Sequence, residues 1–171
     1  MTHASEPRAD DAVRWFVEQF ALLLADSGLP RMAARVFAYL LAGDREKHTV
    51  GQVAAGLGMS PAAVSGAVRH LSQAGLVIKD REPGASADSY RVYEDAWQVI
   101  AVRTVDSVDR AVDVLSASVE RLDQETAAVS DGVREALEFY RFWSGELPAT
   151  MERWREHRRT VLGRQTSAAR A

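Results

Sequence analysis

The chain has 171 residues, a net charge of -3 and no cysteine. This length suits one ordinary domain or a small module with a helical extension, and 47% hydrophobic residues are enough for a buried core. The longest apolar run, Phe20–Ala25, is far shorter than the roughly 20 residues that cross a bilayer, and the polar start does not resemble a secretory leader. The lack of cysteine excludes disulfides, thiolate metal sites and catalytic thiols. We therefore expect a cytoplasmic globular protein without a membrane segment.

Two amphipathic helices are predicted near the start of the chain. Asp10 is a typical N-cap for the first helix, whose apolar residues recur at helical spacing until Gly28 ends it. Pro30 suits the first position of the second helix, which ends before Gly43. Both helices are expected to turn an apolar face towards a core.

Two shorter helices follow in close succession. Thr49 and Gln52 have the spacing of a capping box, which satisfies free amide donors at a helix start. Ser60 followed by Pro61 is a second start signal, and Gly75 closes that helix. Two short helices joined by a tight turn are typical of a helix-turn-helix.

A β-hairpin is predicted directly after these helices. The segment VIKDRE alternates as a strand does, PGASADS is a turn-rich tip, and the return strand begins at Tyr90. A helix-turn-helix followed by a hairpin is the order of a winged helix, which the stretch from Thr49 to Val92 fits throughout. The expected fold class is mainly α with a small two- or three-stranded β-wing, the winged helix-turn-helix being flanked by N- and C-terminal dimerisation helices.

The fourth predicted helix has one face that can reach a DNA major groove. If it buries Val64, Val68 and Leu71, helical geometry turns the remaining positions to the opposite side. The DNA-binding candidates at this helix are Ser60, Pro61, Ala62, Ser65, Gly66, Arg69 and His70. Arg69 is the candidate for bidentate recognition of a guanine, whereas Ser60 has mainly a capping role and His70 is equally compatible with a solvated side chain.

These residues carry a family resemblance. The chain resembles the MarR superfamily of bacterial transcription regulators, and within it the GbsR-like branch. The resemblance runs from about Phe16 to Val92, with GLPRMAARVFAYLLAGD leading into the helix-turn-helix and the wing ending in SYRV. It implies an obligate homodimer that inserts two recognition helices into successive major grooves of double-stranded DNA, and a small-molecule effector that often releases the DNA.

The wing departs from the family pattern. The resemblance implies two or more arginines at the wing tip, in a pattern like G-x-R-R-x-x-Y, whereas the stretch from Gly84 to Tyr90 contains none. Lys79, Arg81 and Arg91 are the candidates to contact phosphates instead. Between Asp44 and Arg91, the basic residues Arg45, Lys47, Arg69, Lys79, Arg81 and Arg91 face the acidic residues Asp44, Glu46, Asp80, Glu82 and Asp88. We therefore expect a shallow salt dependence of DNA binding, since each neutralised phosphate contributes about 0.9 to the log-log slope.

A heptad seam is predicted after the wing. Between Ala96 and about Thr126 no glycine or proline interrupts the chain, and apolar residues recur at alternating steps of four and three. About three heptads favour subunit contact over packing within one chain, because one winged module cannot cover so long a stripe. The dimerisation candidates are Phe16, Phe20, Val105, Val108, Val112, Leu115, Val119 and Leu122. Asp131 opens a further amphipathic helix, and a basic, aromatic tail follows Pro148.

The segments suggest five parts. These are a flexible N-terminus (1–9), an N-terminal helix contributing to dimerisation (10–28), a winged helix-turn-helix DNA-binding domain (29–94), a helical dimerisation region (95–164) and a flexible C-terminus (165–171). Trp15, Trp97, Tyr140 and Trp143 are candidates for lining an effector cavity, with core or interface filling as the alternative.

Signatures of catalysis and of metal binding are not found in the sequence. The four histidines lack metal-ligand spacing, and there is no P-loop, GxGxxG, GxSxG or catalytic carboxylate pair. We expect no enzyme, metal or cofactor. The predicted function is that of a homodimeric transcription regulator, a repressor at a pseudo-palindromic operator with half-sites about one helical turn apart. The alternative is a winged-helix protein-interaction or scaffold module with weak DNA affinity, which the arginine-free wing tip motivates.

Overall fold

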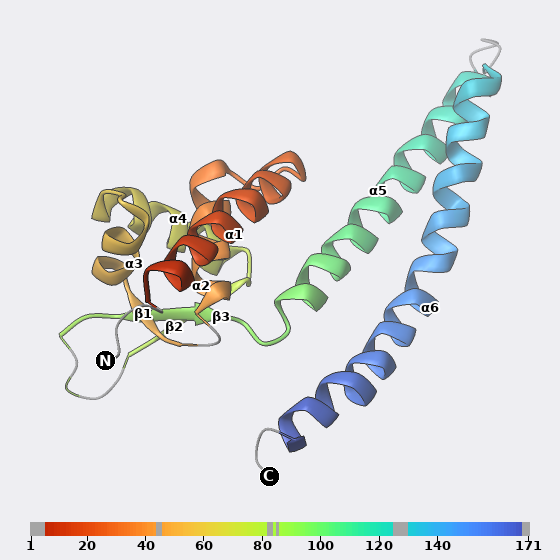
Figure 1. Cartoon of the computed structure of the whole chain (residues 1–171). Coiled ribbons are helices and arrows are strands. Elements are labelled where there is room, and N and C mark those ends of the chain that lie inside the picture. Colours follow the sequence, from red (N-terminus) through yellow and green to blue (C-terminus); the bar gives the residue numbers. More distant parts are fainter. Residues whose placement is uncertain (1–5, 44–45, 82–83, 85, 125–129, 169–171) are drawn as a thin grey trace. The chain divides into compact units, whose positions relative to one another are not determined.

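The computed structural model describes residues 6–43, 46–81, 84, 86–124 and 130–168, with side chains described from 11 to 161 within these ranges. The described residues form six helices and three strands. The chain divides into two compact units, Met1–Ala96 and Trp97–Ala171. We call them the winged-helix unit and the helical-pair unit (Figure 1).

The first two helices form the base of the winged-helix unit. α1 (Glu6–Asp26) packs on α2 (Arg31–Ala42) through small and branched side chains such as Val17 and Ala21, both buried. α2 also contacts α3, α4 and β3, so it is buried on more than one side. Its buried residues are Ala33, Ala34, Val36, Phe37, Ala38 and Leu40. This central position makes α2 the core element of the unit.

A tight connection joins α1 to α2. Gly28 has a φ of 97°, a left-handed conformation that glycine adopts without steric cost. The Leu29 amide then donates to the Leu24 carbonyl at 3.0 Å, which satisfies a free group at the helix end. Pro30 is the N-cap of α2 with ψ of 132°, not its first helical residue as predicted.

The start of α1 corrects another prediction. The helix begins at Glu6, so Asp10 lies inside it and is not the N-cap. Residues 6–9, predicted to be flexible, are helical. Pro7 fits this position because amides in the first helical turn have no intrahelical acceptor to lose.

The helix-turn-helix consists of α3 (Val50–Leu57) and α4 (Pro61–Gln73). The predicted capping box is confirmed: the Gln52 amide donates to Thr49 Oγ1 at 3.3 Å, and the Thr49 amide donates to Gln52 Oε1 at 2.8 Å. Gly58 ends α3 in a left-handed conformation with a φ of 60°. The local signals in the sequence therefore determine where both helices begin and where the turn lies.

The wing is part of a three-stranded antiparallel sheet. β1 (His48–Thr49), β2 (Val77–Asp80) and β3 (Ser89–Val92) follow the order β1-β3-β2. In the β2–β3 hairpin, Val77 pairs with Val92 and Asp80 with Ser89. Of the two predicted sheet sizes, the larger one is present, because β1 pairs with β3 on the side away from β2.

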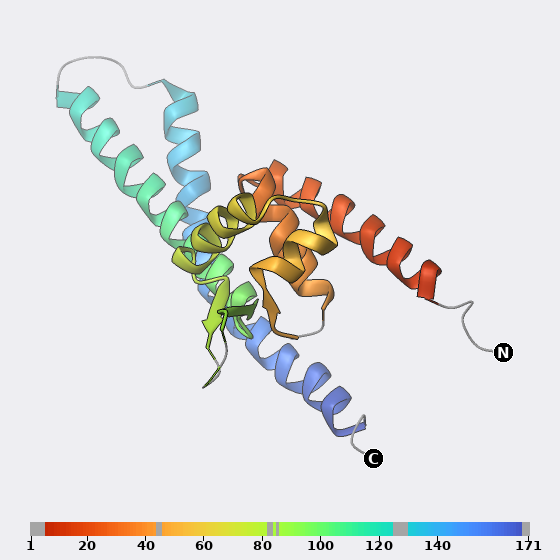
Figure 2. The same cartoon turned by 90° about the vertical axis from the view of Figure 1, so that its left-hand side faces the viewer.

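The helical-pair unit is built from two long antiparallel helices, α5 (Ala96–Gln124) and α6 (Asp131–Ala168) (Figures 1 and 2). Polar contacts join the middle and the second half of α5 to the first part of α6. Ser144 Oγ donates to Asp109 Oδ1 at 2.5 Å, and Arg134 pairs with Asp123 at 3.0 Å. Asp109 and Asp123 are two heptads apart, so one face of α5 lies towards α6.

α6 contains a proline in its interior. The helix continues past Pro148, where the missing amide leaves the Ser144 carbonyl without its usual intrahelical donor. The basic, aromatic segment after Pro148 is therefore part of α6. Residues 165–168, predicted to be flexible, are also helical.

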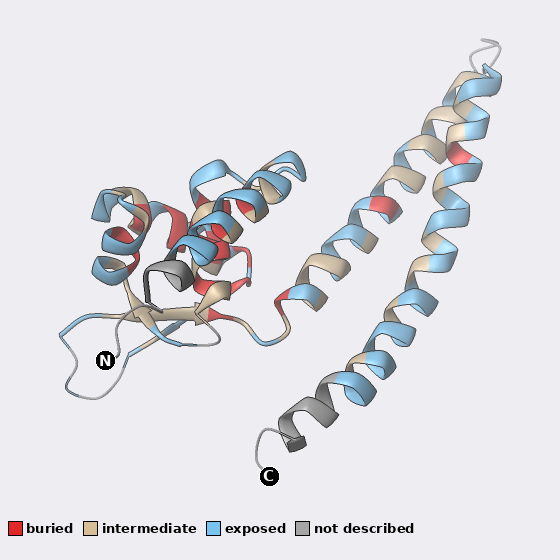
Figure 3. Ribbon diagram, viewed as in Figure 1, coloured by how far each residue is buried: buried red, intermediate tan, exposed pale blue. Residues whose placement is uncertain are grey.

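Burial differs strongly between the units (Figure 3). Among the described residues of the helical-pair unit, Val108 and Leu137 alone are buried, whereas the winged-helix unit has a continuous core. Several large apolar side chains of the helical pair remain exposed: Trp97, Val102, Val114, Phe139, Phe142, Trp143, Trp154 and Val161. The winged-helix unit can bury its own core, but the helical pair leaves apolar surface uncovered.

Candidate nucleic-acid interface

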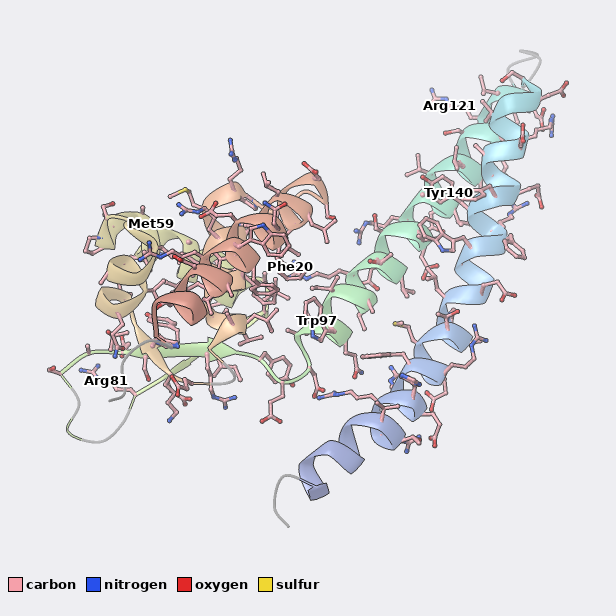
Figure 4. The ribbon with its side chains drawn as sticks, in the orientation of Figure 1. Phe20, Met59, Arg81, Trp97, Arg121 and Tyr140 are labelled. Atoms are coloured by element: carbon pink, nitrogen blue, oxygen red, sulfur yellow. The ribbon has the colours of Figure 1, made fainter. Side chains whose placement is uncertain are left out.

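The start of α4 is fixed by local chemistry. Ser60 is the N-cap, and its side-chain oxygen accepts a hydrogen bond from the Ala63 amide at 3.2 Å. Pro61 follows as the first helical residue, where its missing amide costs no hydrogen bond. The Met59 amide donates to the Ala54 carbonyl at 3.0 Å, which holds the turn between α3 and α4 (Figure 4).

α4 has a buried face and an exposed face, as its sequence pattern predicts. Val64, Ala67, Val68 and Leu71 are buried in the unit's core. The predicted DNA-binding positions on the helix lie on the other side: Pro61, Ala62, Gly66, Arg69 and His70 are exposed, and Ser65 is half-buried. The structure therefore brings these candidates together on one solvent-facing surface.

Arg69 forms no ion pair with any of the described residues. No carboxylate in the described part of the chain pairs with it, and its side chain is exposed. An arginine in this state retains all five guanidinium donors for a ligand, in a planar fork that matches two acceptors on a guanine edge.

The cations of the wing are in a different state. Lys79 Nζ lies 2.7 Å from Asp88 Oδ2, and Arg81 Nε lies 3.8 Å from Asp88 Oδ1. The hydrogen bond from Lys79 holds the pKa of Asp88 below its ordinary value, and the same bond raises the pKa of Lys79. Both groups of this pair are therefore charged at neutral pH. Figure 4 shows Arg81 at the end of the outgoing strand.

A second carboxylate, that of Asp80, lies at the end of β2, opposite Ser89. Arg91 Nε donates to Asp80 Oδ2 at 3.1 Å, and Lys47 Nζ lies 3.6 Å from the same oxygen. The hydrogen bond from Arg91 is the main cause that lowers the pKa of Asp80. The phosphate-contact candidates Lys79, Arg81 and Arg91 thus all lie against aspartates.

Neither aspartate is predicted from the sequence pattern as part of the site. A partial signal was present, since Asp80 stands between Lys79 and Arg81 in the chain. Which carboxylate meets which cation, however, depends on the register of the hairpin, in which Asp80 lies opposite Ser89. Composition alone gives the charge balance of the wing, but it does not tell which of the cations lies against which carboxylate.

The predicted dimerisation residues are partly covered within the single chain. On α1, the rings of Phe16 and Phe20 stack with centroids 5.4 Å apart, and both are half-buried. Val108 is buried on α5, and the other predicted seam residues of α5 are half-buried: Val105, Val112, Leu115, Val119 and Leu122. The most exposed apolar side chains of the helical pair are other residues, namely Phe142, Val114 and Phe139.

The four predicted effector-cavity residues are distributed over both units. Trp15 on α1 is 69% exposed and Trp97 on α5 is 41% exposed. Tyr140 and Trp143 are neighbours on α6, with ring centroids 6.4 Å apart. Their shared role in a cavity stays a prediction.

A cavity of about 370 Å³ lies elsewhere, within the winged-helix unit. Its lining comes from one face of α1, from α2 and from the end of α3: Val13, Arg14, Val17, Glu18, Arg35, Tyr39, Ala55, Gly56, Leu57 and Gly58. Arg35 binds Glu18 Oε1 through two nitrogens, at 2.6 and 3.0 Å. A Cβ at Gly56 would lie 2.3 Å from Tyr39 Oη, so the glycine makes room for this ring. This cavity is not predicted from the sequence.

The described residues contain neither a cluster of metal ligands nor a helix that could span a membrane. Across the described residues, no three metal-ligating side chains of the His, Cys, Asp or Glu types gather in one place. No helix in that part of the chain has the length and apolar character needed to span a bilayer.

Two family models match the chain. A MarR family model matches residues 27–86, and a model described as an MmpR5-like MarR family transcriptional regulator matches residues 95–157. The chain belongs to the MarR family of transcriptional regulators. The matches do not distinguish the GbsR-like branch, which stays a prediction. No curated protein matches the chain.

The fold of the chain is similar to that of a solved structure with a TM-score above 0.5. The crystal structure of a transcriptional regulator is 20% identical, covering 85% of this chain and 99% of its own, with a TM-score of 0.67. BpsR of Bordetella bronchiseptica is 17% identical over 81% of this chain and 93% of its own, and AdcR of Streptococcus pyogenes is 18% identical over 85% and 98%. Their TM-scores of 0.38 and 0.37 support no closer comparison. The first structure therefore confirms the winged-helix fold.

Proposed function

We propose that this MarR-family regulator is a homodimeric repressor that reads a pseudo-palindromic operator through the exposed face of α4. The observation that carries the proposal is the state of Arg69, an exposed arginine without a carboxylate partner among the described residues, opposite the buried face of the recognition helix. Family regulators act by binding DNA, so the chain needs no catalytic group.

The roles of the α4 residues follow from their places on the helix. Arg69 recognises a guanine edge in the major groove, where bidentate pairing distinguishes it from the other bases. Ser60 and the free amides at the helix start lie where a phosphate is favoured by the helix dipole. Small residues such as Ala62 and Gly66 allow close approach to the bases, with Pro61, Ser65 and His70 at the margin of the contact. Lys79, Arg81 and Arg91 contribute less, since each lies against an aspartate.

Dimerisation is supported by the uncovered apolar surface of the helical pair. A monomeric protein rarely leaves several large aromatic side chains exposed on one helix face. Phe139, Phe142 and Trp143 follow helical i, i+3, i+4 spacing, and the rings of Phe139 and Trp143 are 5.8 Å apart. We propose that this cluster joins the α5 seam and the Phe16–Phe20 pair in the subunit interface.

Replacing Phe142 with alanine is expected to weaken the dimer about tenfold, roughly 1–2 kcal/mol, because an aromatic side chain loses its burial in the partner. The unfolding free energy of the helical pair should change little, since Phe142 is 69% exposed in the single chain. Sedimentation velocity over a range of concentrations measures the dissociation constant.

Met32→Ala is the matched control, because Met32 is 42% exposed on α2 and is not assigned to the interface. An unchanged dimer in Phe142→Ala, or equal weakening in Met32→Ala, would contradict the proposed interface.

Release by a small molecule is the second part of the proposal. The cavity bounded by α1, α2 and α3 is a candidate site, because an occupant would touch both the helix-turn-helix at Leu57 and the base of the unit at Val17. The predicted set of Trp15, Trp97, Tyr140 and Trp143 is the other candidate. In either place, a ligand acts only if it binds the DNA-free arrangement more tightly than the DNA-bound one.

Selection of genomic DNA tests the function as a whole. Purified protein is mixed with sheared DNA from its own genome at low salt, and the retained fragments are sequenced. We expect enriched fragments that share an inverted repeat with half-sites about one helical turn apart. Enrichment without any repeat would contradict a symmetric dimer.

A protein-interaction or scaffold role is the second candidate. The observation that favours it is the pairing of the wing cations with Asp80 and Asp88, which reduces the charge available to phosphates. Absence of retained DNA at low salt would support this role and reject the repressor.

A further inference from the structure

The wing carries its own counter-ions. Asp88 lies against Lys79 and Arg81, and Asp80 lies against Arg91 and Lys47. All four cations come from the hairpin or from the segment that leads into β1. Each of these four cations is thus paired with one of the two carboxylates.

The two carboxylates differ in what surrounds them. Asp80 and Arg91 are both largely covered, with side chains 32% and 26% exposed, so their bond ties β2 to β3 inside the sheet. The two cations around Asp88 are more exposed to solvent than the carboxylate they pair with. The Lys79 side chain is 55% exposed and that of Arg81 is 67% exposed, whereas the Asp88 side chain is 27% exposed. The Asp88 pairs are therefore the ones that meet an approaching polyanion.

The position of the Asp88 carboxylate is unusual for a surface acid. Its Oδ1 atom is buried and accepts no hydrogen bond from the described residues, and Arg81 Nε lies 3.8 Å from it. Its Oδ2 atom accepts the short bond from Lys79. One acid thus lies beneath two cations and reduces the positive field of both.

We propose that Asp88 limits the affinity of this regulator for DNA by occupying, on Lys79 and Arg81, the place of a backbone phosphate. The inference rests on the proposed DNA-binding function and assigns a role to one residue within it. A cation that is already paired with a carboxylate neutralises a DNA phosphate less completely, so fewer of the counter-ions condensed on the DNA are released and the salt-dependent part of binding is small. Recognition of the operator then depends on α4. The wing adds little of the phosphate-binding affinity that is the same for every DNA sequence.

The test replaces Asp88 with asparagine, which keeps the size of the side chain and removes its charge. The probe is a random-sequence DNA duplex, because phosphate contacts do not depend on sequence. We expect Asp88→Asn to bind this duplex about tenfold more tightly near 0.1 M salt, with a log-log salt slope steeper by up to about 1.8 per wing. Fluorescence anisotropy across a salt series measures both quantities.

Asp26→Asn is the matched control, because Asp26 is exposed at the end of α1 and its replacement changes the net charge equally. Lys79→Gln with Arg81→Gln is the second control. In the parent protein this double change should alter the affinity for the duplex less than twofold. In the Asp88→Asn protein the same double change should abolish the tighter binding that the asparagine produces. The spectrum of the folded protein by circular dichroism should be the same for all variants.

Two results would overturn the inference while leaving the function intact. The first is a parent protein that binds DNA and an Asp88→Asn variant that binds no more tightly than Asp26→Asn. The second concerns the double change of Lys79→Gln with Arg81→Gln in the parent protein. The inference fails if this change lowers the affinity for DNA as much as the loss of two unpaired phosphate contacts would. Failure of every variant to bind any DNA would instead reject the proposed function, and the inference with it.

Discussion

Replacing Phe37 with alanine is expected to lower the unfolding free energy of the winged-helix unit by about 3–5 kcal/mol. Phe37 is fully buried at the centre of α2, which contacts α1, α3, α4 and β3. Removing the ring loses its transfer free energy and leaves a cavity, because the surrounding helices cannot all move inward together. A loss of this size is a large fraction of the stability of a typical domain.

Urea unfolding followed by circular dichroism measures this change. Phe142→Ala is the matched control, since it deletes the same ring at a position that is 69% exposed. The control should be compared below the dimer dissociation constant, so that the interface does not contribute. Equal destabilisation by both substitutions would show that Phe37 is not the centre of the core.

Replacing Arg69 with alanine is expected to weaken operator binding by about 1–3 kcal/mol and to relax the preference at one base position in each half-site. The reason is that Arg69 is exposed on α4 without a carboxylate partner in the described part of the chain, so its donors are available to a guanine. Selection from a randomised operator library, compared between parent and variant, measures affinity and base preference together.

Two controls separate base recognition from general electrostatics. Arg69→Lys keeps the charge and loses the planar fork, so it should retain most of the non-specific affinity and lose the preference for guanine. Arg103→Ala removes an exposed arginine from α5 and should leave the base preference unchanged. Uniform weakening of Arg69→Ala on all sequences would identify a phosphate contact instead.

The α4 surface is the part of the candidate site that the sequence predicts best. Ser60 and Pro61 mark the start of the helix, and the spacing of Val64, Val68 and Leu71 determines which side is buried. Because both signals are local, the exposed position of Arg69 follows without knowledge of the rest of the fold. Its role in binding stays a proposal.

The errors occur where local rules permit more than one outcome. Asp10 is a good N-cap, but the helix extends back to Glu6 because neither Pro7 nor the polar residues beside it prevent a further turn. Residues 165–168 were predicted to be flexible, yet α6 extends to Ala168. Local propensity is a weak guide at the ends of a long helix.

The sequence by itself determined the order of the helices and of the β2–β3 hairpin, the turn of the helix-turn-helix and the buried face of α4, since these depend on caps, glycines and periodicity within a few residues. Tertiary structure alone decided the ionic state of the wing and the cavity beside Tyr39. In the wing, the hairpin brings Asp88 to Lys79 across the tip, and Coulomb interactions depend on that distance and on solvent exposure, which composition does not contain. The near-neutral charge balance of the wing follows from the sequence, but the fold determines which cation pairs with which carboxylate.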